Sequence, residues 1–275
     1  ADAMSNFKLD NDQRTSEQPR PPLQSAPPSS RPLLVLDVNG LLLDRRQGRG
    51  SSSPDPGRPA DLHERGWSIY LRPHMREFIA WCFDHFVVGV WTSAMLKNVR
   101  ILLSTAFGEY YQRLHFVWDQ AFCTVAEGAK HPENAHKPIF LKELSRLWAP
   151  GAPGFSFGPS RTVLLDDSVY KTALNPPYTS LHPPEWKATV EGSHFASQTG
   201  PGRDNGLAEG GELRVLLNAL ASAESLPEAM RSAEAHHEHL VVAGERKEQV
   251  LSQVPGLMAY CHMRENGDGG SGRSG

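Results

Sequence analysis

The stretch LLVLDVNGLL, residues 33–42, contains the features that decide the fold. Its first four residues form a short apolar run bounded by polar residues and by Gly40, which is typical of a strand buried on both faces. Asp37 follows the run directly, so its carboxylate is expected at the carboxyl end of that strand. Strands covered on both faces occur in α/β proteins, where helices pack on each side of a mainly parallel sheet. The stretch therefore predicts an α/β fold.

Two further apolar runs also end in oxygen-bearing side chains. Residues 86–91 lead to Thr92, and residues 162–165 lead to Asp166 and Asp167. Ligands of an open parallel sheet bind at the carboxyl ends of its strands, so these side chains should converge with the aspartate of the first run. Carboxylates placed close together repel one another unless a cation lies between them, and Mg²⁺ prefers oxygen ligands. The three runs together predict a site for Mg²⁺ and phosphate.

The rest of the chain divides by composition and hydrophobic periodicity. Polar, proline-rich residues 1–31 predict a disordered arm, and glycine-rich, serine-rich stretches predict flexible insertions at about 44–66 and 191–211 within a domain spanning 32–223. Apolar residues at helical spacing predict helices, and the end of the chain reads as a helical tail, 224–263, followed by a disordered Gly/Ser tail, 264–275. The predicted helices cover residues 75–83, 93–103, 138–148 and 212–223, and residues 170–186 are expected to form an ordered loop.

Charge and cysteine content limit the partners and the compartment. The 28 basic and 31 acidic residues give a formal net charge of -3, so no general attraction to nucleic acid or to an anionic membrane is expected. No apolar window is long enough to span a bilayer. Three widely spaced cysteines suit neither a disulfide framework nor a CxxC metal site. We therefore expect an intracellular, reducing compartment, the nucleus or the cytoplasm rather than an organelle, and the sequence does not indicate an oligomeric state.

Four short motifs carry a resemblance to a known superfamily. They are DVNGLL at 37–42, WTS at 91–93, KELSRL at 142–147 and LLDDS at 164–168, and in order and spacing they resemble the motifs of haloacid-dehalogenase (HAD) superfamily phosphatases. RPHMREF at 72–78 and the apolar helix after GEL at 211–213 are similar to one branch of it. This is the FCP1-homology, NLI-interacting-factor-like branch, which includes carboxy-terminal-domain small phosphatases and the import subunit TIM50. The resemblance implies a HAD-like, Rossmannoid fold with no large cap domain.

The resemblance also implies roles for individual residues. Asp37 would be the nucleophile that becomes an aspartyl-phosphate, and it would also ligate Mg²⁺. Thr92, Ser93 and Lys142 would bind the phosphoryl group, with Lys142 neutralising its charge. Lys137 is the alternative for the lysine role, although the register of KELSRL favours Lys142.

The remaining metal ligands implied by the resemblance are the backbone carbonyl of Asn39 and the carboxylates of Asp166 and Asp167. At position 39 active members have a second aspartate, which protonates the leaving alcohol and then activates water. An amide cannot transfer a proton at neutral pH, so Asn39 predicts that phosphate binding survives better than turnover. The next motif position, usually Thr or Val, is the bulkier Leu41.

Three functions are consistent with these residues. The first is a Mg²⁺-dependent phosphatase-like domain that acts on phosphoserine or phosphothreonine in a protein or peptide, with reduced turnover. The second is a catalytically inactive pseudophosphatase that binds a phosphoprotein or serves as a subunit of a complex. The third is a small-molecule phosphatase, but that would require a cap domain, and residues 44–66 are too few and too polar to form one.

Overall fold

The computed structural model describes residues 30–47, 58–64, 66–132, 134–188 and 204–268. The strands are β1 (Leu33–Leu36), β2 (Leu43–Gln47), β3 (Leu62–Glu64), β4 (Trp67–Leu71), β5 (Val87–Trp91), β6 (Val117–Trp118), β7 (Thr124–Val125), β8 (Phe140–Leu141), β9 (Thr162–Leu165) and β10 (Ser180–Leu181). The α-helices are α1 (Met75–His85), α2 (Leu96–Phe107), α3 (Leu144–Leu147), α4 (Glu212–Ala221), α5 (Leu226–Ala233), α6 (Gly244–Ser252) and α7 (Leu257–Asp268). The short 3-10 helices are η1 (Gly108–Arg113), η2 (Gln120–Phe122), η3 (Pro159–Arg161) and η4 (Val169–Thr172).

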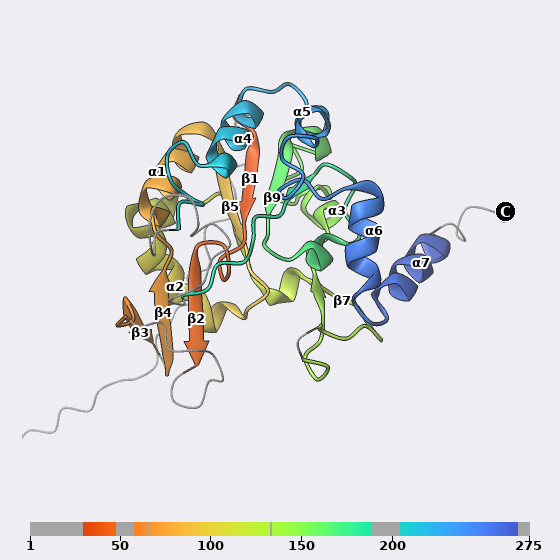
Figure 1. Ribbon diagram of the computed structural model, residues 1–275, viewed down its shortest axis with the longest axis horizontal. Helices are drawn as coiled ribbons and strands as arrows, with labels where there is room; N and C mark the ends of the chain where they lie inside the picture. The colour runs from red at the N-terminus through yellow and green to blue at the C-terminus, as the bar shows by residue number, and fades with distance from the viewer. Residues whose placement is uncertain (1–29, 48–57, 65, 133, 189–203, 269–275) are drawn as a thin grey trace, which may run out of the picture.

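A parallel sheet of five strands forms the centre of the molecule, in the order β10-β9-β1-β5-β6 (Figure 1). The four residues of β1 are fully buried. Leu34 and Leu36 pack into the apolar cluster that includes α1, α2 and α4, whereas Leu33 and Val35 pack into a second cluster that includes α3. Successive side chains of a strand point to opposite faces, so β1 is covered on both sides. The predicted α/β fold with a mainly parallel sheet flanked by helices is confirmed.

Helix α2 begins later than the sequence predicts. The prediction placed it at 93–103, whereas the helix covers Leu96–Phe107. Its first turn is fixed by Asp119, whose Oδ2 accepts a hydrogen bond from the Leu96 N–H at 2.9 Å. Its end is set by Gly108, whose φ of 54° lies in a region that favours glycine.

The predicted helix at 138–148 is wrong for most of its length. Strand β8 occupies its first part and pairs antiparallel with β7, and only the four-residue helix α3 follows. The side chain of Asn175 holds the intervening residues out of a helix. Its Oδ1 accepts from the Leu144 N–H at 2.8 Å, and its Nδ2 donates to the Lys142 carbonyl at 2.9 Å. The apolar periodicity of this segment reflects contacts with two different clusters rather than one helical face.

The first predicted insertion, 44–66, contains regular structure. Strands β2, β4 and β3 form a small antiparallel sheet in that order. Asp44 and Arg46 form a buried ion pair at 2.8 Å, and the Arg45 guanidinium lies over the Trp67 ring at 4.3 Å. Cross-strand pairing and these contacts order a segment whose composition alone indicates a loop. Residues 48–57 and 65 lie outside the described residues.

The second predicted insertion, 191–211, is ordered where it is described, from residue 204 onward. Asp204 is buried and pairs with the buried Arg72, whose Nε donates to Asp204 Oδ2 at 2.5 Å and whose Nη1 donates to the Leu41 carbonyl at 3.0 Å. Leu207 is fully buried in the main apolar cluster. These contacts tie the segment to the loop that follows β1. The predicted arm at 1–31 lies outside the description except for its last two residues.

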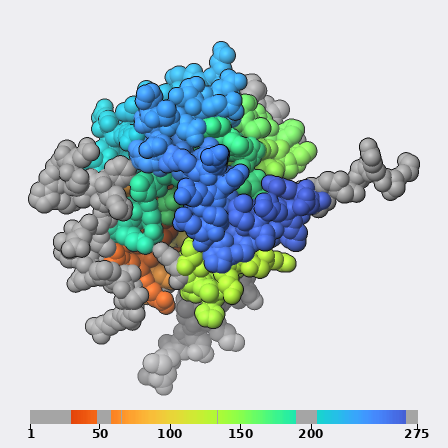
Figure 2. Space-filling model, turned by 45° about the vertical axis from the view of Figure 1, so that its right-hand side comes forward, coloured from red at the N-terminus to blue at the C-terminus, as the bar shows by residue number. Residues whose placement is uncertain are grey.

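The chain beyond residue 223 packs onto the sheet domain rather than forming a separate tail. Helix α5 packs beside α4, and α6 packs beside η4 and α7 (Figure 1). Residues of α6 and α7 form a third apolar cluster with β8 and with neighbours of η4, and the members of that cluster include Ile139, Leu141, Leu251, Leu257 and Tyr260. Figure 2 shows α6 and α7 on the surface beside the segment around 130. Helix α7 reaches Asp268, so the Gly/Ser tail predicted from 264 begins too early; residues 269–275 lie outside the described residues.

Candidate functional site

Asp37, Asp166 and Asp167 meet at the carboxyl edge of the parallel sheet. Strands β1 and β9 are neighbours, and the Asp37 N–H donates to the Leu165 carbonyl at 2.9 Å, which fixes the register of the two strand ends. One carboxylate oxygen from each aspartate lies within 4.8 Å of the others. Parallel pairing of two buried strands thus brings Asp37 together with Asp166 and Asp167, which lie far from it in the sequence.

Gly40 allows the loop after β1 to approach these carboxylates. Its φ is +84°, and a Cβ at this position would lie 2.6 Å from Asp167 Oδ2, which is too close for any side chain. The Gly40 carbonyl also accepts from the Trp186 N–H at 2.7 Å, which ties the loop to the segment after β10. A glycine is therefore required here both by backbone conformation and by the close approach of the loop to Asp167.

Lys142 lies between two of the carboxylates. Its side chain is fully buried, and its Nζ is 3.0 Å from Asp37 Oδ1 and 2.6 Å from Asp166 Oδ2. Lys142 follows β8, and a hydrogen bond fixes its main chain beside η4, because its N–H donates to the Lys171 carbonyl at 2.7 Å. Lys137, the alternative for the lysine role, is exposed. The structure thus places Lys142, and not Lys137, beside the aspartates.

A second lysine, Lys171, enters the site from η4 and was not predicted from the sequence. Its Nζ lies 2.7 Å from Asp37 Oδ2, 2.9 Å from Asp166 Oδ1 and 3.5 Å from Asp167 Oδ1. The residue is buried. The sequence contains no periodic signal for it, because Asp167 lies before η4 and η4 is a 3-10 helix of only four residues.

The aspartates differ in their electrostatic surroundings. Burial acts to raise the pKa of Asp166, but the ion pairs with Lys142 and Lys171 outweigh burial and hold that pKa below its ordinary value. Burial, together with the charges of Asp166 and Asp37, raises the pKa of Asp167 to about 8 despite the opposing charge of Lys171. Burial acts to lower the pKa of Lys171, but the three carboxylates raise it well above the usual value.

Thr92 and Ser93 follow β5, the neighbour of β1, at the same edge of the sheet. Thr92 is buried, its N–H donates to the Trp118 carbonyl at 2.9 Å, and its Oγ1 accepts from the Ala94 N–H at 3.2 Å. Ser93 is half-buried in the turn that follows. The backbone thus positions both residues at the predicted edge, and the Thr92 hydroxyl caps the turn there.

Asn39 is exposed, and its side chain is hydrogen-bonded to the backbone of β2. Its Oδ1 accepts a hydrogen bond from the Arg45 N–H at 3.0 Å, at the start of the small antiparallel sheet. This bond holds the amide toward β2. An aspartate at position 39 could accept the same bond with one oxygen and keep the second oxygen free.

His182 makes hydrogen-bond contacts with the segments that carry Asp166 and Lys171. This buried ring makes a 2.8 Å contact from Nδ1 to the Asp166 carbonyl, and its Nε2 lies 3.3 Å from the Thr172 hydroxyl and 3.0 Å from the Ser180 hydroxyl. Burial lowers the pKa of His182 to about 4, so the ring is neutral at physiological pH. The ring therefore links β9, β10 and η4 through uncharged hydrogen bonds.

The three aspartates suit a hard cation such as Mg²⁺. They offer carboxylate oxygens, the ligand type that Mg²⁺ prefers, within 4.8 Å of one another. Asp167 Oδ1 is buried and, among the described residues, has no hydrogen-bond donor. The cation that lies near this oxygen is the Lys171 ammonium, 3.5 Å away, and a bound Mg²⁺ would supply a direct ligand contact in its place.

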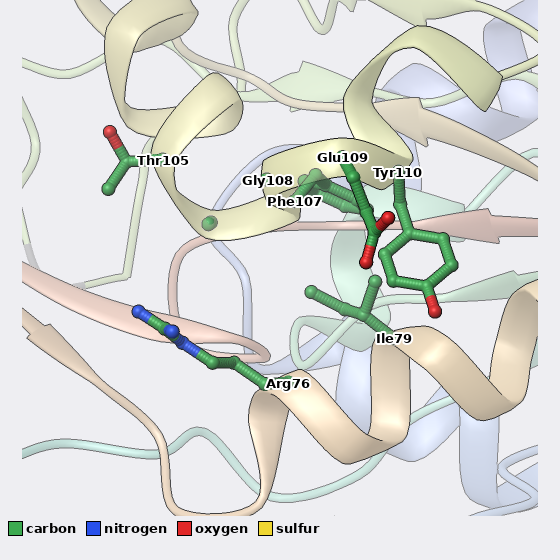
Figure 3. A pocket seen from close by; sticks show the side chains of 8 residues that line it. Arg76, Ile79, Thr105, Phe107, Gly108, Glu109 and Tyr110 are labelled. Carbon is green, nitrogen blue, oxygen red and sulfur yellow. The ribbon is translucent and has the colours of Figure 1, made fainter.

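The described surface also has a cavity that is not lined by the residues of this site. A cavity of about 220 Å³ lies between α1 and the junction of α2 with η1, lined by Arg76, Ile79 and residues 105–110 (Figure 3). Its lining includes none of the aspartates or lysines described above. No helix among the described residues is long and apolar enough to cross a membrane.

Comparison with known proteins gives a family match and weaker relatives. Residues 32–198 match the family described as NLI interacting factor-like phosphatase. An uncharacterized FCP1 homology domain-containing protein of Schizosaccharomyces pombe is 27% identical over 154 residues, which span 54% of this chain and 58% of that protein. The chain thus matches little more than half the length of this relative.

Two solved structures of the RNA polymerase II CTD phosphatase Fcp1, the first of them from fission yeast, are also similar. One, of a variant bound to beryllium fluoride, has a TM-score of 0.37 and 14% identity, over 86% of this chain and 64% of that one. The other has a TM-score of 0.36 and 12% identity, over 89% and 67% of the two chains.

Proposed function

Because the chain belongs to the NLI interacting factor-like phosphatase family, we propose that its FCP1-like phosphatase domain is a Mg²⁺-dependent phosphoprotein phosphatase with reduced turnover. Its substrate would be phosphoserine or phosphothreonine in a protein or peptide. The observation that carries the proposal is the meeting of Asp37, Asp166, Asp167 and Lys142 at one buried edge of the sheet. The proposed compartment is the one expected from the cysteines, the nucleus or the cytoplasm.

Asp37 is the proposed nucleophile. One of its oxygens attacks the phosphorus, the bond to the serine or threonine oxygen breaks, and an aspartyl-phosphate remains until water attacks its phosphorus and releases phosphate. Lys142, 3.0 Å from Asp37 Oδ1, is placed to neutralise charge on the phosphoryl oxygens during both steps. Mg²⁺ held by Asp37, Asp166, Asp167 and the Asn39 carbonyl would screen the repulsion between the nucleophile and the phosphate.

Asn39 accounts for the reduced turnover. Its amide cannot give a proton to the departing alkoxide or take one from the attacking water, so these protons must be exchanged with solvent. Loss of general acid-base assistance typically costs about 100- to 10,000-fold in rate. The loss should be smaller for an aryl phosphate, because a phenolate of pKa about 10 leaves without a proton more readily than an alkoxide does.

The structure favours a protein substrate over a small molecule. The segment in which a cap domain could be inserted forms, in its described part, only the three short strands β2, β4 and β3. In that described part no separate cap domain stands over the edge of the sheet, which supports a protein or peptide substrate.

One set of assays tests the proposal. Mg²⁺-dependent hydrolysis of an aryl phosphate and of a phosphoserine peptide is measured for the native protein, Asp37→Asn and Asn39→Asp. We expect slow aryl phosphate hydrolysis by the native protein, none by Asp37→Asn, and a gain for Asn39→Asp that is larger on the phosphoserine peptide. Equal activity of the native protein and Asp37→Asn would refute the assignment of the nucleophile.

A pseudophosphatase is the second candidate, and the position of Asn39 favours it. The Asn39 side chain is exposed and bonded to the Arg45 N–H, and both oxygens of Asp37 are held by ammonium groups. A domain of this kind would bind a phosphopeptide without hydrolysing it. It predicts micromolar binding of a phosphopeptide with no activity in the native protein, and activity only in Asn39→Asp.

A further inference from the structure

Lys171 occupies the space among the three carboxylates that a metal ion would need. Its Nζ approaches one oxygen of each of Asp37, Asp166 and Asp167, at 2.7, 2.9 and 3.5 Å. Lys142 differs, because it approaches the other oxygens of Asp37 and Asp166 and has no such contact with Asp167. The two ammonium groups therefore contact different oxygens of Asp37 and Asp166, and of the two only Lys171 also contacts Asp167.

The backbone around Lys171 holds its side chain in this position. The Lys171 N–H donates to the Ser168 carbonyl at 3.1 Å, and its carbonyl accepts from the Lys142 N–H at 2.7 Å. The next residue is fixed as well, since the Thr172 carbonyl accepts from Lys247 Nζ at 2.9 Å. Three hydrogen bonds thus hold the main chain of η4, whereas the four-carbon side chain of Lys171 can change conformation without breaking them.

Mg²⁺ would draw on the same three carboxylates as this ammonium group. Mg²⁺ binds oxygen at about 2.0–2.1 Å and accepts little departure from octahedral geometry. An ion held by one oxygen of each of these aspartates would be a second cation beside Nζ, and two cations close together in a buried site repel strongly. Either the metal or the Lys171 ammonium can occupy the space, but not both.

We propose that Lys171 is a resident counter-cation that competes with Mg²⁺ for Asp37, Asp166 and Asp167, so that metal binding requires its ammonium to leave. This deepens the proposed function and rests on it for the identity of the metal. In the absence of metal, Lys171 keeps the three carboxylates together and the site formed. The native protein therefore binds Mg²⁺ weakly for a site with three carboxylates, and removal of this one ammonium group strengthens the binding.

The direct test is the affinity for the metal alone, measured by isothermal titration calorimetry with Mg²⁺ and by the paramagnetic resonance of free Mn²⁺. The proteins compared are the native chain, Lys171→Met and Lys142→Met, with the exposed Lys137→Met as the control for a general loss of charge. Methionine is unbranched like lysine, lacks only its terminal nitrogen in length, and removes its charge. We expect at least tenfold tighter binding by Lys171→Met, a clearly smaller gain for Lys142→Met and no change for Lys137→Met.

Three results would overturn the proposal. The first is an affinity of Lys171→Met for the metal within threefold of the native value. The second is an equal gain in affinity in Lys171→Met and Lys142→Met, which would indicate an effect of charge without competition. The third is the absence of metal binding in all four proteins. The readout is binding, so it is independent of hydrolysis. Loss of activity in Asp37→Asn would still support the proposed function if the Lys171 proposal failed.

A measurement on the native chain covers the case in which Lys171→Met does not fold. Reductive methylation of lysines, quantified by peptide mass spectrometry, reports how freely each ammonium group meets solvent. We expect saturating Mg²⁺ to raise the methylation rate of Lys171 at least threefold and to leave that of Lys142 unchanged. Bound Mg²⁺ with no change at Lys171 would contradict displacement.

Discussion

Lys247 connects helix α6 to the segment that carries Lys171, and its replacement by methionine has a calculable effect. Its Nζ donates to the Thr172 carbonyl at 2.9 Å and to the Asn175 carbonyl at 3.1 Å, at the end of η4 and just beyond it. Burial lowers the pKa of Lys247 to about 8, from an ordinary value of 10.5. A neutral amine still has two N–H donors, so both hydrogen bonds can persist after deprotonation.

The direction of the pH effect follows from the two pKa values. Below about pH 8 both the folded and the unfolded chain carry the proton on Lys247. Between pH 8 and 10.5 the folded chain releases it while the unfolded chain retains it, so the free energy of unfolding rises with pH. One pKa unit corresponds to about 1.36 kcal/mol, so the rise due to this lysine is at most about 3 kcal/mol.

Urea unfolding followed by tryptophan fluorescence, at several pH values from 7 to 10.5, measures this contribution. The free energy of unfolding of Lys247→Met is subtracted from that of the native protein at each pH. The subtraction removes the contribution of groups that titrate in both proteins. We expect the difference to move in favour of the native protein by about 2–3 kcal/mol across this range, and Lys137→Met to show no such trend. A difference that does not depend on pH would refute the conclusion that the buried amine is neutral at high pH.

Three other perturbations test features of the fold. Asp204→Asn should lower the free energy of unfolding by about 3–5 kcal/mol, because it leaves the buried Arg72 guanidinium without its carboxylate; denaturant titration measures this, and a loss below 1 kcal/mol would contradict it. Gly40→Ala should lower the free energy of unfolding by about 1–3 kcal/mol and weaken metal binding, since the new Cβ would lie 2.6 Å from Asp167 Oδ2. Thermal unfolding measures the loss, and an unchanged melting temperature would contradict the described conformation of this loop. Burial raises the pKa of the Cys123 thiol to about 11, so alkylation by iodoacetamide at pH 8 should be on the order of 100-fold slower than for free cysteine, measured by mass spectrometry, and a comparable rate would show that the thiol is accessible and ionised.

The central sheet could be predicted because each of its long strands is a continuous apolar run. Strands β1, β5 and β9 bury nearly all their side chains, so local composition and tertiary position agree. The two-residue strand β10 could not be predicted in this way. It lies in a segment that its prolines mark as a loop, and it pairs with β9 only because η4 reverses the chain.

The same contrast holds for the site. Asp37, Asp166 and Asp167 end apolar strands, and the position at the end of a strand is visible in the sequence. Lys142 lies in the part of the predicted helix 138–148 that is not helical in the structure, yet its side chain still lies beside Asp37. Lys171 escaped prediction because its direction depends on a short 3-10 helix, whose side chains follow no long periodic pattern.

The cluster of apolar side chains that α6 and α7 share with β8 has a consequence for where a shortened chain could end. The family match ends at residue 198, but Leu251, Leu257 and Tyr260 lie in one apolar cluster with Ile139 and Leu141, next to the segment that carries Lys142. The segment that matches the family is therefore shorter than the part of the chain that packs around Ile139 and Leu141. A chain shortened to residue 198 would keep the aspartates and lose α6 and α7, and we expect it to be less stable than the full chain.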